Sequence, residues 1–307
     1  MRIVVFGDDR CVGVLAGEQV IDLNRADSSL PADLEDFINA GPAAIQGAQL
    51  AVDRASSLEP GALQSLSSVK LRAPWPSRRI ACVGGNYAAH LRGMQGDGNL
   101  TLEEVTRRTR EAGQWGFWKV PYTVAGPEDQ IPFPKRCTYF DYEGEVAIVI
   151  GKQGKDIAGS RLGEYVWGVT LFDDWSIRDG MGSPRPMSYN LPKNFDGSTS
   201  MGPCIVVGEL KPQEVDVELR VNGEVRQQYN TRDMVFTFAE VLEELSRDFT
   251  FVPGDVISGG TSAGTAQDST PRGPDGKRSL ERFLKVGDVV ELSSPKIGTL
   301  RNRIVKA

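Results

Sequence analysis

The sequence predicts an α+β protein rich in strands, with a small N-terminal α/β domain ahead of a larger domain. Beyond residue 73, short runs of apolar or alternating residues bounded by Gly, Pro or Asp recur and predict strands. Few helices are marked in that part of the chain. The segment KLRAPWPSRR, with two prolines and no periodicity, indicates a linker. We therefore divide the chain into residues 1–73 and 74–307.

The N-terminal part combines strands and helices. Apolar and alternating runs predict strands over residues 2–6, 11–17 and 19–23. Two helical stretches follow, over residues 30–41 and 42–56. This order predicts a small α/β unit without a motif that indicates its function.

Two helices of the larger domain are marked by their caps. Thr237 and Glu240 have the spacing of a capping box ahead of an apolar face. Thr101 and Glu104 repeat that spacing, and Gly113 is a typical helix stop. The second helix carries Glu–Arg pairs four residues apart, which predicts a largely solvated helix. The strands between these helices predict a β-rich domain with few helices.

Composition excludes several classes of protein. The net charge is -6 and Lys and Arg form no stripe, which argues against nucleic-acid binding. No apolar run approaches the roughly 18 residues of a membrane span, and the N-terminus lacks the features of a signal peptide. The cysteines are far apart in the sequence, which indicates reduced thiols. They are Cys11, Cys82, Cys137 and Cys204. We expect a cytoplasmic protein without nucleic-acid or membrane partners.

The chain has a single histidine, His90. Zinc hydrolases with two or three histidine ligands are therefore excluded, and the cysteine spacing argues against a Cys-rich zinc site. A metal site in this chain has to be built mainly from oxygen atoms. Such sites favour Mg²⁺, Mn²⁺ or Ca²⁺.

Two acidic clusters adjoin buried runs. FDYEGEVAIVIG contains Glu143 and Glu145, which lie on one face of a strand because side chains alternate. VTLFDDWSIRD supplies Asp173, Asp174 and Asp179 after another apolar run. Two Glu and one Asp from a neighbouring strand would give a divalent ion three oxygen ligands and leave positions open for substrate. The alternative is the solvated face of an edge strand.

Three further residues have competing interpretations. His90 follows a Gly-Gly turn, so a catalytic role and a structural role both stay open. Lys193 lies beside a Gly-rich turn and is either a solvated lysine or a group that anchors a carboxylate or transfers a proton. Ser262 lies in a G-x-S-x-G pattern, but no histidine follows it, which argues against a serine hydrolase. That Gly-Thr turn could still offer N–H groups and a hydroxyl to a carboxylate.

Taken together, these segments resemble the fumarylacetoacetate hydrolase family over roughly residues 74–307. No single motif is decisive, but the motifs occur in the family's order with similar spacing. They are GGNYAAH, FDYEGEVAIVIGK, GVTLFDDWSIRD, LPKNFDGSTSMGP, NGEVRQ with TRDMVFTFAEVLEELS, FVPGDVISGGTSAG and LKVGDVVELSSPKIGTLRNRI.

The resemblance implies a mixed β-sandwich roll, usually a homodimer, with Mg²⁺ or Mn²⁺ in the active site. It assigns metal ligation to Glu143, Glu145 and Asp174. The remaining site residues follow by the same resemblance. They are His90 as the base or proton donor of a lid segment, Lys193 beside the metal, Thr261 at the substrate's carboxylate end, and Tyr87 and Arg178 as further substrate contacts.

The sequence departs from the family pattern after the histidine. Many members carry a Glu three residues later, which forms a dyad with the histidine, whereas this chain has Gly93. An insertion follows over residues 95–114, and we expect it to belong to the lid. Glu103, Glu104 or Glu111 from this insertion is a candidate replacement for the missing carboxylate.

The leading expectation is hydrolytic C–C cleavage of an acylpyruvate-like β-diketo or 2-oxo acid through a metal-stabilised enolate. Decarboxylation, tautomerisation, or hydration and dehydration of a sugar-derived oxo acid would use the same enolate. A third possibility is a non-catalytic relative that binds a small acid. Metal-dependent turnover separates the enzymes from the last class.

Overall fold

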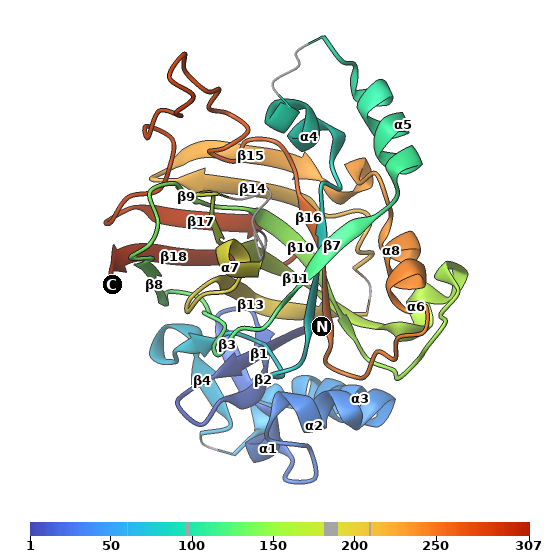
Figure 1. Cartoon of the computed structure of the whole chain (residues 1–307). Helices are drawn as coiled ribbons and strands as arrows, with labels where there is room; N and C mark the ends of the chain where they lie inside the picture. The colour runs from blue at the N-terminus through green and yellow to red at the C-terminus, as the bar shows by residue number, and fades with distance from the viewer. Residues whose placement is uncertain (60, 96–98, 181–189, 209) are drawn as a thin grey trace.

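The computed structural model describes residues 1–307 except 60, 96–98, 181–189 and 209, and consists of two packed β-sheets with surrounding helices (Figure 1). This is the strand-rich α+β architecture that the sequence predicts. All four cysteines are free. Within the described residues, no helix is long and apolar enough to span a membrane.

The larger sheet has eleven strands and holds β10 and β11 in its middle. Its order is β4-β3-β2-β1-β13-β11-β10-β16-β6-β7, and β5 pairs with β1. The bounds are β1 Arg2–Phe6, β2 Cys11–Ala16, β3 Gln19–Asp22, β4 Leu63–Ser65, β5 Leu71–Arg72, β6 Ile80–Gly84, β7 Trp115–Lys119, β10 Gly144–Ile150, β11 Val166–Asp174, β13 Thr199–Val207 and β16 Val256–Thr261.

The second sheet has five strands in the order β15-β14-β17-β18-β8, and a separate ladder joins β9 to β12. The bounds are β8 Gln130–Phe133, β14 Asp216–Val221, β15 Glu224–Asn230, β17 Val289–Ser294, β18 Gly298–Lys306, β9 Phe140–Asp141 and β12 Ser176–Ile177.

Helices cover the edges and the N-terminal strands. The α-helices are α1 Leu23–Ala26, α2 Leu34–Asn39, α3 Gly41–Asp53, α4 Ala88–Gln95, α5 Leu102–Ala112, α6 Leu162–Tyr165, α7 Asn190–Lys193 and α8 Phe238–Leu245. Short 3₁₀ turns are η1 Ala55–Ser57, η2 Leu66–Ser68, η3 Gly159–Arg161 and η4 Thr231–Asp233.

Strand β10 is buried on both faces. Val146 and Ile148 belong to the core between the two sheets, while Ala147 and Val149 belong to a second core on the opposite face. This explains why the run VAIVI has no polar alternation, because both faces of such a strand exclude water. The acidic residues at the start of β10 are therefore fixed by the most buried part of the fold.

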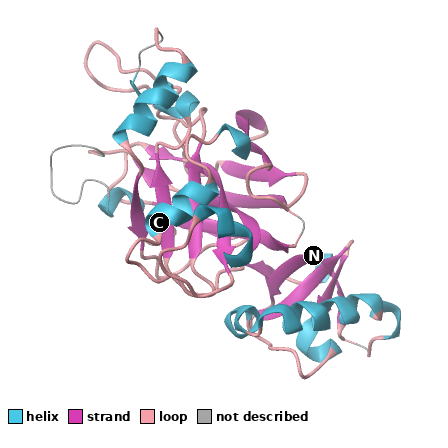
Figure 2. Cartoon of the chain, turned by 90° about the vertical axis from the view of Figure 1, so that its right-hand side faces the viewer, coloured by secondary structure: helices cyan, strands magenta, loops and turns pink. Residues whose placement is uncertain are grey.

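The N-terminal part shares a sheet with the rest of the chain. Ile3 of β1 is paired with Ile205 of β13 in an antiparallel register. Phe37 of α2 contacts Trp167 of β11 edge-on, with ring centroids 6.2 Å apart. Figure 2 shows these N-terminal helices gathered on one side of their strands. The division of the chain into two domains near residue 73 stays a prediction.

The predicted helix caps are present. The hydroxyl of Thr237 accepts from the backbone of Glu240, whose carboxylate accepts in return, so the capping box is complete. Thr101 caps α5, and Gly113 ends it with a φ of 84°. Of the ion pairs expected on α5, Arg108 with Glu104 is formed at 2.8 Å, whereas Arg107 pairs with Glu104 and Glu111 rather than with Glu103.

Candidate metal centre and active site

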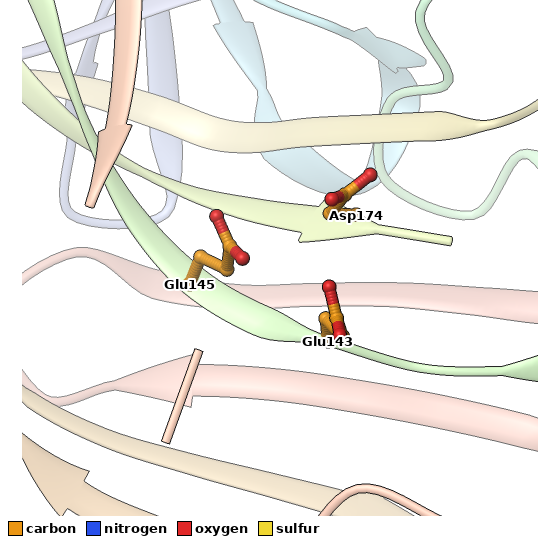
Figure 3. A group of neighbouring side chains, drawn as sticks. All are labelled: Glu143, Glu145 and Asp174. Atoms are coloured by element: carbon orange, nitrogen blue, oxygen red, sulfur yellow. The ribbon is translucent and has the colours of Figure 1, made fainter. Parts of the chain in front are cut away.

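The predicted ligands Glu143, Glu145 and Asp174 lie together in the structure (Figure 3). Their carboxylate oxygens are within 4.8 Å of one another, and all three side chains are buried. Strands β10 and β11 bring them together because the backbone N–H of Asp174 donates to the carbonyl of Glu143 at 3.0 Å. Residues opposite each other in an antiparallel pair point to the same face, so Asp174 joins the two glutamates.

Each of these carboxylates has one oxygen held by a protein donor, which fixes its orientation. The donors are the guanidinium of Arg178 for Glu143 at 2.5 Å, the hydroxyl of Ser258 for Glu145, and the ammonium of the fully buried Lys119 for Asp174.

Lys193 lies between the remaining oxygens. Its ammonium donates to Oε2 of Glu143, to Oδ2 of Asp174 at 2.6 Å and to the hydroxyl of Ser176 at 2.7 Å. Lys193 is therefore a cation that already balances part of the charge at this centre. Lys193 also lines the cavity beside these carboxylates.

The two glutamates have opposite electrostatic environments. Burial raises the pKa of Glu145 well above its ordinary value, and the charges of Asp174 and Glu143 add to that rise. Burial acts in the same direction on Glu143, but Arg178 and Lys193 outweigh it and hold the pKa of Glu143 below its ordinary value. Burial also raises the pKa of Asp173 to about 8. Glu145, whose hydrogen-bond partner is the neutral hydroxyl of Ser258, is thus the carboxylate of the cluster whose charge is least compensated.

The donor set fits a divalent cation. Three buried carboxylates held side by side repel one another, and burying them without compensation is costly. The oxygen atoms of Glu143, Glu145 and Asp174 are hard ligands of the kind that Mg²⁺ and Mn²⁺ prefer, and Ca²⁺ also accepts them. These residues would hold the ion, with Arg178 and Lys119 orienting the ligands.

His90 has a carboxylate partner that the sequence did not indicate. Nδ1 of His90, in α4, lies 2.7 Å from Oδ2 of Asp268, and both side chains are buried. Asp268 is itself fixed, because the backbone N–H of Gly264 and the hydroxyl of Ser269 donate to its Oδ1 at 3.0 and 2.9 Å. Nε2 is left as the ring nitrogen that can act in the adjoining cavity.

The position of Asp268 explains the glycine at 93. A Cβ on Gly93 would lie 2.8 Å from Cβ of Asp268 and 3.1 Å from its carbonyl oxygen. A Glu at residue 93 and an Asp at residue 268 therefore compete for one space. The expectation that Glu103, Glu104 or Glu111 replaces the missing carboxylate is wrong, because Asp268 occupies that position and Glu104 and Glu111 bind arginines of α5.

A cavity of about 190 Å³ connects these groups. The predicted site residues in its lining are His90, Lys193, Thr261, Arg178, Glu143, Glu145 and Asp174. Tyr87 lies outside the lining, buried in the core with its ring edge-on to Tyr229 at 5.1 Å between centroids. Its position therefore does not support the expected substrate contact.

Thr261 ends strand β16 beside the cavity, and Ser262 follows it. The Thr261 hydroxyl donates to the carbonyl of Gly144 at 3.0 Å and accepts from the Gln227 amide at 2.8 Å. Within the described chain, the His90 ring is bonded to Asp268 and not to Ser262. The G-x-S-x-G pattern thus continues from strand β16 without the base that a serine nucleophile requires.

Three residues of this site carry no signal in the sequence that predicts their roles, and they are Lys119, Ser258 and Asp268. Lys119 follows an aromatic run and Ser258 lies inside an apolar strand, so neither carried a recognisable motif. Asp268 lies in a polar loop 178 positions from its partner His90. The one available signal was Gly93, whose missing side chain leaves room for a carboxylate from elsewhere in the fold.

Comparisons with known proteins agree with this geometry. A model of the family described as fumarylacetoacetate (FAA) hydrolase C-terminal matches residues 79–305. Oxaloacetate tautomerase YisK of Bacillus subtilis is 32% identical over 95% of this chain and 94% of that protein. Oxaloacetate tautomerase FAHD2B, mitochondrial, of Homo sapiens is 31% identical over 99% of this chain and 92% of that protein.

Solved structures share the fold over the whole chain. Fumarylacetoacetate hydrolase from Exiguobacterium antarcticum is 29% identical, with a TM-score of 0.75 and full coverage of both chains. Maleylpyruvate hydrolase from Sphingobium sp. SYK-6, solved in complex with manganese(II) and pyruvate, is 24% identical with a TM-score of 0.74 and full coverage of both. The second likeness shows the fold alone.

Proposed function

The chain belongs to the fumarylacetoacetate hydrolase family, and on that premise we propose that it is a divalent-metal-dependent enzyme that moves a proton at carbon 3 of a 2-oxo acid. Keto–enol tautomerisation is the first candidate reaction, with oxaloacetate as the first substrate to test. The observation that carries the proposal is the His90–Asp268 pair in the same cavity as the three-carboxylate cluster. Relatives of about this chain's length bear the name oxaloacetate tautomerase.

The protein groups supply what a proton transfer requires. Mg²⁺ or Mn²⁺ held by the carboxylate cluster would act as a Lewis acid toward the 2-oxo group. In the keto-to-enol direction, Nε2 of His90 takes the proton from carbon 3 and delivers it to the 2-oxo oxygen. In the reverse direction, it takes the proton of the enol hydroxyl and delivers it to carbon 3. Asp268 keeps the imidazole in the required tautomer and stabilises the imidazolium. The positive charge of Lys193, whose ammonium already donates to Glu143, Asp174 and Ser176, stabilises the substrate oxygen that gains negative charge.

Hydrolytic C–C cleavage of an acylpyruvate is the second candidate. It adds the activation of water to the same proton-transfer chemistry. The absence of Glu at residue 93 argued against an effective base, and the His90–Asp268 contact removes that objection. The Exiguobacterium antarcticum structure, with the name fumarylacetoacetate hydrolase, favours this candidate too.

A turnover experiment tests the proposal. Metal-stripped protein, with and without Mg²⁺ or Mn²⁺, is mixed with the enol form of oxaloacetate, and loss of the enol absorbance is recorded. Acylpyruvates are tested in parallel, with products identified by mass. We expect metal to restore enol loss well above the rate with free metal, and His90→Ala to remove most of that gain while Mn²⁺ still binds. A metal-independent rate, or an unchanged rate in His90→Ala, would contradict the proposal.

A further inference from the structure

The cavity changes character along strand β7. Every second residue of β7 lies on the same face of the strand, so successive residues on that face are about 7 Å apart. On one face these residues are Lys119, Phe117 and Trp115. Lys119 contacts Asp174, and the Lys193 ammonium lies 5.3 Å from the centroid of the Phe117 ring. Trp115 lies one step farther from the carboxylates and is 46% exposed. Along β7, the side chains therefore change from a charged lysine beside the carboxylates to an aromatic ring at the solvent-exposed end of the cavity.

The Trp115 ring is held in place at that end of the cavity. Gly84 is paired with Trp115 across β6 and β7. A Cβ on Gly84 would lie 2.3 Å from the indole, and one on Gly85 would lie 3.2 Å from its Nε1. The indole thus lies directly on the backbone of this Gly-Gly pair. A large aromatic surface is kept half exposed beside the cavity rather than being buried in the core.

Helix α4 provides a second apolar surface of the same cavity. Leu91 and Met94 line it together with Trp115, and Met94 lies one helical turn after His90. Leu91 also reaches the glycine pair, because its Cδ2 is 3.0 Å from a Cβ placed on Gly85. An indole and two aliphatic side chains therefore line the outer, solvent-exposed part of the cavity.

Positive charge in the described lining is confined to the inner end. The lysine and arginine of the lining are Lys193 and Arg178, and each donates to Glu143. The described lining places no lysine or arginine beside Leu91, Met94 or Trp115. A carboxylate carried into that outer region would lose hydration without gaining a cation from the described lining, which is unfavourable.

We infer that the site accepts a 2-oxo acid with an uncharged, apolar substituent, and that Trp115, Leu91 and Met94 bind that substituent. This inference rests on the proposed function for the acid head, which lies at the carboxylate cluster. A four-carbon acid such as oxaloacetate would occupy the inner end alone. A longer aliphatic or aromatic chain would bury additional apolar area, and each methylene so buried raises affinity up to about fourfold.

Calorimetric titration of the Mn²⁺-loaded protein tests this inference with three ligands. Oxalate probes the inner end alone. 2-Oxohexanoate and 2-oxoadipate have equal chain lengths but end in a methyl group and a carboxylate, and neither contains the 1,3-dicarbonyl that C–C hydrolysis requires. We expect 2-oxohexanoate to bind at least about tenfold more tightly than 2-oxoadipate. Equal affinity, or tighter binding of 2-oxoadipate, would overturn the inference.

Trp115→Ala and Trp118→Ala form a matched pair of variants. Trp118 is on the opposite face of β7 and packs on Phe249, with centroids 5.0 Å apart. We expect Trp115→Ala to weaken the binding of 2-oxohexanoate about tenfold and that of oxalate by less than about twofold. Trp118→Ala should change neither affinity. Equal losses in both variants would overturn the inference. If oxalate fails to bind wild type in a metal-dependent way, the proposed function fails instead.

Discussion

At the residue scale, Gly93 and Asp268 are two parts of one arrangement. The carboxylate that orients His90 comes from a loop distant in sequence, and the glycine gives that loop its room. We expect Asp268→Gly to lower kcat on the order of a hundredfold, because an imidazole without its carboxylate partner is poorly oriented and a weaker base. Adding Gly93→Glu to this variant should raise kcat at least about tenfold, because the side chain of Asp268 no longer blocks residue 93.

The control for this exchange is metal binding. The Mn²⁺ affinity should stay within about twofold in both variants, because neither residue touches the carboxylate cluster. Full activity in Asp268→Gly would reduce the pair to a structural contact. Lack of rescue in the double variant, with folding intact, would show that position 93 cannot replace position 268.

Individual residues also show which parts of the site can be predicted from the sequence alone. Alternation along one strand predicts that Glu143 and Glu145 share a face, and a neighbouring buried run supplies a further aspartate. The choice of Asp174 as that aspartate came from the family resemblance, and the structure places it beside the two glutamates. Lys119 and Asp268 could not, since their roles arise from contacts between segments far apart in sequence. An isolated lysine or aspartate in a sequence carries no sign of such a partner.

At the element scale, local signals gave α5 and α8 correctly because helix caps are encoded within four residues. The strand β7 was not predicted, because WGFWK is a short run of mainly aromatic residues beside an insertion. Its position at the edge of the larger sheet depends on pairing with β6, which is a tertiary contact. Predictions of isolated elements thus succeeded where stabilisation is local.

Helix α5 anchors the segment that carries His90. Arg110 donates to the Glu240 carboxylate at 2.9 Å, and its guanidinium lies 5.2 Å from the centroid of the Phe236 ring. The side-chain amide of Gln114 donates to the Glu240 carbonyl at 3.1 Å. Since α4 packs on α5, these contacts join α4 to α8. That the insertion acts as a lid stays a prediction. The structure shows the contacts that attach the insertion to α8.

Removing that anchor should loosen α4. Arg110→Ala loses an ion pair and a cation–π contact worth about 1 kcal/mol together, so amide exchange in α4 and α5 should accelerate about fivefold. The turnover rate should fall as His90 becomes less ordered. Arg107→Ala is the control, because the ion pairs that Arg107 forms with described residues, Glu104 and Glu111, lie within α5. Identical exchange in the two variants would mean that the α8 contact does not restrain α4.

At the scale of the whole molecule, the carboxylate cluster lies on the central strands of the larger sheet. β10 and β11 join the N-terminal strands on one side to β16, β6 and β7 on the other. A cation bound at this cluster is therefore held by the centre of the sheet rather than by a surface loop. Such a cation binds the folded chain and has no comparable site in the unfolded chain.

Metal binding should accordingly stabilise the entire fold. At a metal concentration of about 100 times Kd, linkage adds about 2.7 kcal/mol, which raises Tm on the order of 5 °C for a chain of this size. Thermal unfolding of stripped protein with and without Mn²⁺ measures the shift. Glu145→Gln and Asp174→Asn should abolish it, whereas Ser262→Ala, beside the cavity but outside the cluster, should keep it. A shift that survives in both carboxylate variants would place the ion elsewhere, because binding at this cluster cannot stabilise a chain that has lost its ligands.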